Sequence, residues 1–180
     1  MKGIVFTELI EMVEGKWGLA VADKLLQSKG LSSGGVYTAV GTYDDRDMGI
    51  LVGALSKETG MSGDDLQRHF GEYIFGSFAS GYTEMLKGIN SVFGLLSRLD
   101  DFIHPEVQKL YPEATLPGFE VISRDEFKME MWYRSQRKMP HFAEGLMHAA
   151  AAYFGEKISL KWKLIDDEAG LFHFKIDKIG

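Results

Sequence analysis

Residues 130–137 read Glu-Met-Trp-Tyr-Arg-Ser-Gln-Arg and continue an alternation that begins at Phe127. Apolar and polar side chains alternate with a period of two, which predicts a strand with one buried face. On that face the apolar Met129 and Met131 are followed by Tyr133, Ser135 and Arg137. The strand is therefore expected to present a core-facing half and then a row of polar groups.

A phenol, a hydroxyl and a guanidinium in one row are all hydrogen-bond donors. The planar guanidinium fork suits a carboxylate geometrically. The expected ligand has an apolar body with acidic groups along one edge, and haem with its two propionates has that shape. The alternative reading of the same pattern is an edge strand that runs out into solvent.

Composition limits the function classes. The chain has 180 residues, 45% hydrophobic and 26% charged, which fits one soluble globular domain over residues 1–180. No apolar run is long enough for a membrane span, and acidic residues interrupt the N-terminal segment where a secretory signal would lie. Zero cysteines fit a cytoplasmic protein, and a net charge of -6 argues against nucleic-acid binding.

Periodicity divides the chain into a helical first part and a mixed second part. Helical spacing dominates to about residue 60 and returns in stretches to about residue 110. Period-two runs then predict strands at 119–122, 127–135, 158–164 and 172–176, with a helix over 140–154. We expect an α+β fold in which a helical part, about residues 1–60, packs on a part of about residues 61–180 with an antiparallel sheet.

The apolar helical stretch from about residue 90 to 103 ends at His104-Pro105. Proline cannot donate the next helical hydrogen bond, so the helix must kink or restart there. That junction could turn the His104 imidazole into a cavity as a metal ligand, although a capping or core histidine is the commoner role. The acidic pairs 44–45 and 100–101 are interpreted as helix caps and turns, and no nucleotide or serine-nucleophile motif occurs.

Three motifs together resemble those of the H-NOX family, the haem nitric oxide/oxygen-binding domains related to the sensor of soluble guanylate cyclase. They are His104, the loop Ala114-Thr115-Leu116-Pro117, and the strand Tyr133-x-Ser135-x-Arg137, in the order and approximate spacing of the family. The resemblance covers essentially the whole chain. It implies that haem b is the cofactor and that His104 is the proximal iron ligand.

The resemblance also implies roles for the residues around the haem. Tyr133, Ser135 and Arg137 would hold the propionates, in agreement with the donor row inferred from the residues alone. Pro117 would press on the porphyrin with Val5 nearby. Pro105 departs from the usual family pattern and leaves the course of the proximal helix open.

Ligand choice follows from the same resemblance. Family members that hold oxygen present a distal tyrosine supported by polar groups, and the matching positions here are Phe142, Leu9 and Ile74, all apolar. The expected ligand is therefore NO, with CO also able to bind. His141 neighbours Phe142 and would reach the pocket only if the helix were rotated.

Stand-alone family members regulate a histidine kinase or a cyclic-di-GMP enzyme, so the resemblance implies a cytoplasmic NO sensor and not an enzyme. Two other classes remain open at this point. One is a haem enzyme of the peroxidase type, which needs a polar distal acid/base pair. The other is a haem-free regulatory module that binds a different amphipathic acid.

Overall fold

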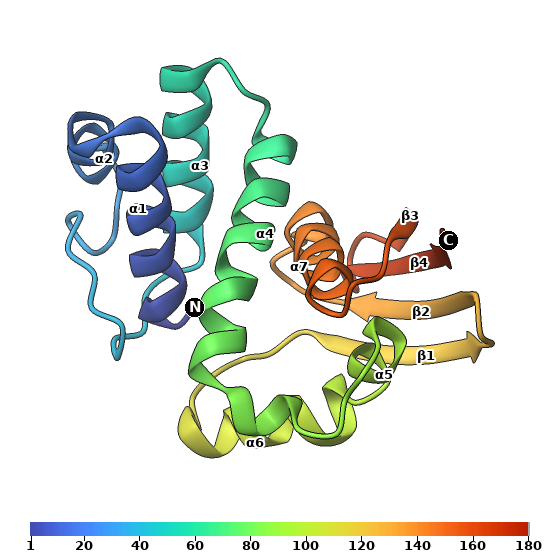
Figure 1. Cartoon of the computed structure of the whole chain (residues 1–180). Helices are drawn as coiled ribbons and strands as arrows, with labels where there is room; N and C mark the ends of the chain where they lie inside the picture. The colour runs from blue at the N-terminus through green and yellow to red at the C-terminus, as the bar shows by residue number, and fades with distance from the viewer. Residues whose placement is uncertain (180) are drawn as a thin grey trace.

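The computed structural model describes residues 1–179. Four antiparallel strands form one sheet in the order β1-β2-β4-β3, and helices precede and cover it (Figure 1). The expected α+β class is confirmed. The elements are α1 (Gly3–Trp17), α2 (Leu19–Leu26), α3 (Arg46–Thr59), α4 (Gly63–Gly81), the 3₁₀ turn η1 (Thr83–Leu86), α5 (Val92–Leu96), the π-helical turn η2 (Leu99–Ile103), α6 (His104–Leu110), β1 (Gly118–Arg124), β2 (Lys128–Arg134), α7 (Pro140–Tyr153), β3 (Ile158–Asp166) and β4 (Leu171–Lys178).

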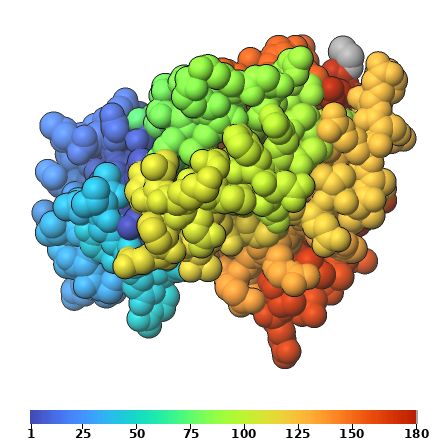
Figure 2. Space-filling model, turned by 90° about the horizontal axis from the view of Figure 1, so that it is seen from below, coloured from blue at the N-terminus to red at the C-terminus, as the bar shows by residue number. Residues whose placement is uncertain are grey.

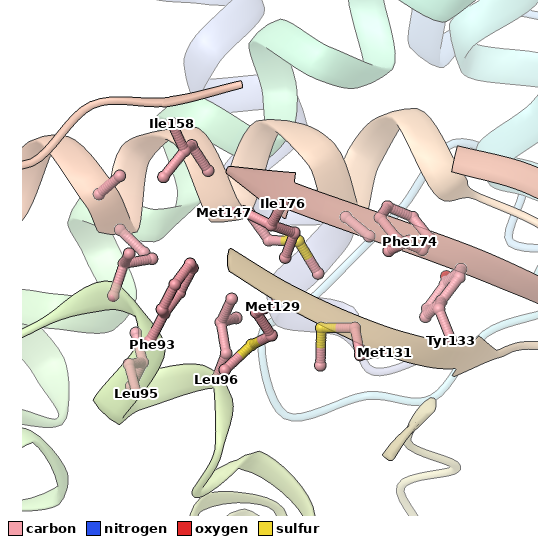
Figure 3. Close-up of a cluster of buried hydrophobic side chains, with 14 of the residues drawn as sticks. Phe93, Leu95, Leu96, Met129, Met131, Tyr133, Met147, Ile158, Phe174 and Ile176 are labelled. Atoms are coloured by element: carbon pink, nitrogen blue, oxygen red, sulfur yellow. The ribbon is translucent and has the colours of Figure 1, made fainter. Parts of the chain in front are cut away.

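The alternation in β2 produces a buried face as expected. Met129, Met131 and Tyr133 are paired in register with Ile176, Phe174 and Phe172 of β4. These side chains pack with α5 and α7 in one hydrophobic cluster, and Figure 3 shows Met129, Met131 and Tyr133 following one another along the strand. Burial of this apolar surface attaches α7 to the sheet.

A second hydrophobic cluster holds the N-terminal helices together. It contains fully buried side chains of α1, α2, α3 and the first half of α4, among them Phe6, Leu25, Leu51 and Phe70. Helix α4 runs between helices α1 to α3 on one side and α7, which covers the sheet, on the other (Figure 1). The two parts of the molecule therefore meet along α4.

Helices α4 and α7 cross in very close contact. A Cβ atom added at Gly71 would lie 2.2 Å from the carbonyl oxygen of Phe142, and one added at Gly145 would lie 2.0 Å from that of Arg68. Neither carbonyl can move without disturbing its own helix. Glycine is required at both positions for the two backbones to approach this closely.

The buried carboxylate of Asp47 fixes the long connection between α2 and α3. It accepts hydrogen bonds from the Ser32 amide (2.8 Å), the Ser32 hydroxyl (3.1 Å), the Ser33 amide (3.3 Å) and the Tyr37 hydroxyl (2.9 Å). Tyr37 also stacks on Phe6 of α1, with ring centroids 4.6 Å apart. Burial alone would raise the pKa of Asp47, but these hydrogen bonds outweigh it and lower the pKa below its usual value.

Two local expectations need correction. The stretch 90–103 is not one helix, because the chain leaves α5 after Leu96 and re-enters as the π-helical turn η2. Strand β2 ends at Arg134, one residue before its predicted end, so Ser135 and Arg137 follow the strand instead of belonging to it. The connection between α2 and α3 forms an isolated β-bridge, between Lys2 and Thr42.

Among residues 1–179, none of the helices combines the length and the apolar character needed to span a membrane.

Asp47→Ala should lower the free energy of unfolding by about 2 to 3 kcal/mol, because it leaves several donors of the 32–37 segment without their acceptor. Chemical denaturation measures this, and Asp23→Ala, at an exposed position of α2, is the matched control. The lowered pKa fixes the sign of the pH dependence: the contribution of Asp47 is present above the unfolded pKa of about 4 and is lost as the pH falls through the folded pKa. Equal stability of Asp47→Ala and Asp23→Ala at pH 7 would contradict this role.

Candidate functional site

A cavity of about 430 Å³ lies between the N-terminal helices, α4, α6, α7 and the end of β2. Its size is typical of a site for a small organic ligand, and most of its wall is apolar. Seven of the predicted site residues line it: Val5, His104, Pro117, Tyr133, Ser135, Arg137 and Phe142. The other two, Leu9 and Ile74, are outside the lining and lie buried in the N-terminal cluster.

His104 stands where the π-helical turn η2 passes into α6. The amide of Ile103 donates to the Arg98 carbonyl (2.9 Å), five residues back, and Pro105 occupies the first turn of α6 where no amide hydrogen is needed. The predicted restart of the helix at this junction is therefore present. Seen from below in Figure 2, the yellow segment around α6 lies between the blue and cyan N-terminal residues on one side and green and gold residues on the other.

The His104 imidazole has one nitrogen occupied and one open. Nδ1 lies 3.0 Å from Oδ1 of Asp100, whereas Nε2 makes no hydrogen bond or ion pair within residues 1–179. Burial lowers the pKa of His104 below its usual value, and the attraction of Asp100 only partly opposes this. A neutral imidazole that donates from Nδ1 keeps the lone pair on Nε2 available for a metal ion.

Tyr133, Ser135 and Arg137 come together on one side of the cavity. The Tyr133 ring is buried between Phe119, 5.0 Å away, and Phe172, 5.7 Å away. Burial raises the pKa of Tyr133, while Ser135 and the charge of Arg137 oppose the shift, so its phenol stays a neutral donor at pH 7. The alternation predicted this grouping, although the strand itself ends before Ser135.

Arg137 also connects distant parts of the chain. Its Nε donates to Oδ2 of Asp45 (2.8 Å), and its Nη1 donates to the Thr115 carbonyl (2.6 Å) in the loop that leads to Pro117. The other carboxylate oxygen of Asp45 pairs with the amino group of Met1 at 2.5 Å. Nη2 of Arg137 has no such partner within the described residues and remains able to bind an acidic ligand.

Sequence reasoning missed two of these partners. Asp45 and Asp100 were both interpreted as caps or turn residues, but the Asp45 side chain makes no cap hydrogen bond and instead binds Arg137. The only available signal was the four-residue spacing of Asp100 and His104, which places the two on one side of a helical turn. The contact of Asp45 with Arg137 spans 92 positions, and no local pattern indicates it.

The side of the cavity formed by α7 is apolar. Its lining residues from this helix are Phe142, Ala143, Leu146, Met147 and Ala150. His141 is not among them, because Nδ1 of its ring lies 2.9 Å from Nη2 of Arg68 and the ring packs against Trp162 at 4.9 Å. The question left open by the sequence is answered: His141 points away from the cavity.

The fold and the cavity define a class of protein. A neutral imidazole, an apolar interior and a set of donors at one edge fit a flat, apolar, iron-containing ligand with acidic groups, which is the chemistry of haem. The family model described as Haem-NO-binding matches residues 2–162. The chain belongs to this family, the H-NOX domains, which are haem-based gas sensors and not enzymes.

Solved structures agree with this assignment. The H-NOX protein from K. algicida, in its Fe(II) unliganded state, is 36% identical with a TM-score of 0.94, covering 100% of this chain and 97% of that one. The H-NOX protein from S. oneidensis in the Fe(II)NO state is 28% identical with a TM-score of 0.88, covering 100% of both chains. The IWP-051-bound H-NOX from Shewanella woodyi in the Fe(II)CO state is 37% identical with a TM-score of 0.84, covering 99% of this chain and 95% of that one. A comparison with curated proteins gives no significant match.

Arg137→Ala should weaken haem retention by about one to two orders of magnitude, because one charge-assisted hydrogen bond contributes about 1.5 to 3 kcal/mol. The rate of haem transfer to a scavenger protein measures the effect. Arg134→Ala is the matched control, since Arg134 is exposed at the end of β2, three positions before Arg137. Equal transfer rates for the two variants would show that Arg137 does not hold the ligand.

Proposed function

We propose that this protein binds haem b in the cavity, senses NO and regulates a partner signalling protein. One observation carries the proposal: His104 lines an apolar cavity and its Nε2 is open. Tyr133, Ser135 and Arg137 line the same cavity. When bound, haem supplies an iron centre that takes NO or CO as a ligand.

Each lining residue has a role in this proposal. His104 is the metal ligand, and Tyr133, Ser135 and Arg137 bind the propionates. Val5 and Pro117 both line the cavity, and we propose that they press on the porphyrin. Leu9 and Ile74 lie in the N-terminal hydrophobic cluster and do not line the cavity itself. Their role in this proposal is to keep the protein apolar on the side of the haem where the gas binds.

The NO-bound state of the S. oneidensis protein and the CO-bound state of the Shewanella woodyi protein support these two gases as ligands. The apolar α7 wall supports a preference for NO over oxygen. Oxygen bound to iron is polarised and is stabilised by a hydrogen-bond donor, whereas NO needs little such help. Phe142 offers no donor.

The signal is proposed to pass between the two parts of the single domain, about residues 1–60 and 61–180. Arg137, Asp45 and Met1 link the cavity edge to the N-terminal helices, and Thr115 links it to the loop before Pro117. A shift of His104 or Pro117 would alter these contacts and change the surface that a partner binds. We propose a histidine kinase or a cyclic-di-GMP enzyme of the cytoplasm as that partner.

His104→Gly tests the metal ligand. The variant should keep its fold, because glycine replaces a residue at a helix junction, and it should bind haem with an altered spectrum that free imidazole restores. Absorption spectroscopy of the ferrous protein, with and without imidazole, measures both effects. An unchanged ferrous spectrum without imidazole would mean that another residue binds the iron.

Phe142→Tyr tests ligand choice. The parent ferrous protein should bind NO and CO but form no stable oxygen complex in air, and the variant should begin to hold oxygen because a phenol can donate to it. One charge-assisted hydrogen bond corresponds to about 10- to 150-fold in affinity. Phe127→Tyr, at an exposed site, is the control. A persistent oxygen complex of the parent would show that some polar group reaches the iron.

A further inference from the structure

We propose that Asp100 is a positioning residue for His104: its carboxylate holds the imidazole by Nδ1, so that Nε2 stays unprotonated and directed to bind the metal. The proposal rests on the proposed function of the cavity and adds a residue to it. Asp100 lies four positions before His104, within the first two residues of the π-helical turn η2.

The Asp100 carboxylate is held from two directions. Oδ1 lies 3.0 Å from Nδ1 of His104, and Oδ2 accepts a hydrogen bond from the Phe119 amide of β1 at 2.7 Å. With both oxygens engaged, the carboxylate cannot rotate freely. It therefore fixes the plane of the imidazole relative to the sheet as well as relative to its own helix.

The chemistry of this contact determines the tautomer. A carboxylate only accepts hydrogen bonds, so the nitrogen of His104 that faces it must carry the proton. The other nitrogen then keeps its lone pair, and electron donation from the carboxylate makes it a stronger metal ligand.

The backbone around the contact departs from α-helical geometry. Ile103 donates to Arg98 and His104 donates to Leu99, each five residues back, which is the π-helical pattern. Such single π turns inside helices are frequent at functional sites. Here the turn ends at Ile103, directly before the residue that would bind the metal.

The contact also joins His104 to the sheet. The Phe119 ring lies 5.8 Å from the His104 ring and 5.0 Å from that of Tyr133. Any displacement of His104 must therefore pull on the Asp100 carboxylate and, through the Phe119 amide, on β1. In the proposed sensor, Asp100 both strengthens the bond to the metal and transmits the movement of His104.

Asp100→Asn tests the proposal while preserving size. The asparagine carbonyl can still accept from Phe119, but its NH₂ group now faces His104 and favours a proton on Nε2. Asp101→Asn is the matched control, since the neighbouring Asp101 is exposed and makes no side-chain hydrogen bond or ion pair within residues 1–179. Asp100→Glu keeps the charge and should rescue the parent behaviour.

Two readouts separate this proposal from the proposed function. Nitrogen-15 NMR of the full chain before haem is added should show His104 protonated on Nδ1 in the parent, Asp101→Asn and Asp100→Glu, but on Nε2 in Asp100→Asn. In the ferrous haem-loaded protein, Asp100→Asn alone should lower the iron–histidine stretching frequency and speed haem loss about 10-fold or more.

The outcomes discriminate between the two ideas. If the parent takes up no haem, the proposed function fails, while the NMR result still decides whether Asp100 sets the His104 tautomer. If the parent binds haem but Asp100→Asn matches it in both tautomer and stretching frequency, Asp100 has no positioning role. If Asp100→Asn does not fold, Asp100→Glu decides the question. An Asp100→Glu protein in which Nδ1 of His104 carries no proton would also overturn the proposal.

Discussion

A guanidinium that is largely removed from water must be paired, and the pairing of Arg137 holds three separate segments around the cavity. Asp45 belongs to the entry of α3, Thr115 to the loop before β1, and Arg137 itself to the turn after β2. The amino group of Met1 completes the arrangement on Asp45. Removing any one member leaves the others with an incomplete set of partners, so the cavity edge depends on all of them together.

The two aspartates at the site act as connectors between elements that local folding would not bring together. Asp45 joins the N-terminal helices to the end of β2, and Asp100 joins the π-helical turn to β1. One carboxylate oxygen of Asp45 binds Arg137 and the other binds the amino group of Met1. One oxygen of Asp100 faces His104 and the other accepts from the backbone amide of Phe119. Some of the acidic residues that give the chain its negative charge therefore have structural roles and do not only face solvent.

Sequence patterns predicted the features that depend on neighbouring residues. The period of two in β2 placed Met129, Met131 and Tyr133 on one face, and Pro105 indicated a restart at His104. Features that depend on distant residues were missed, because the contacts of Asp45 and Asp100 arise only when the chain is folded. The π-helical turn was also missed, since its apolar spacing resembles that of an α-helix, and spacing alone did not show that Leu9 and Ile74 lie outside the cavity wall.

The anchoring of the 32–37 segment bears on how the N-terminal helices respond to force. Asp47 ties this segment to α3, and the stacking of Tyr37 on Phe6 ties it to α1. A long connection that would otherwise be compliant thus becomes a brace between two helices. With α1 and α3 both attached to the same segment and packed in one hydrophobic cluster, these two helices are expected to move together as one body.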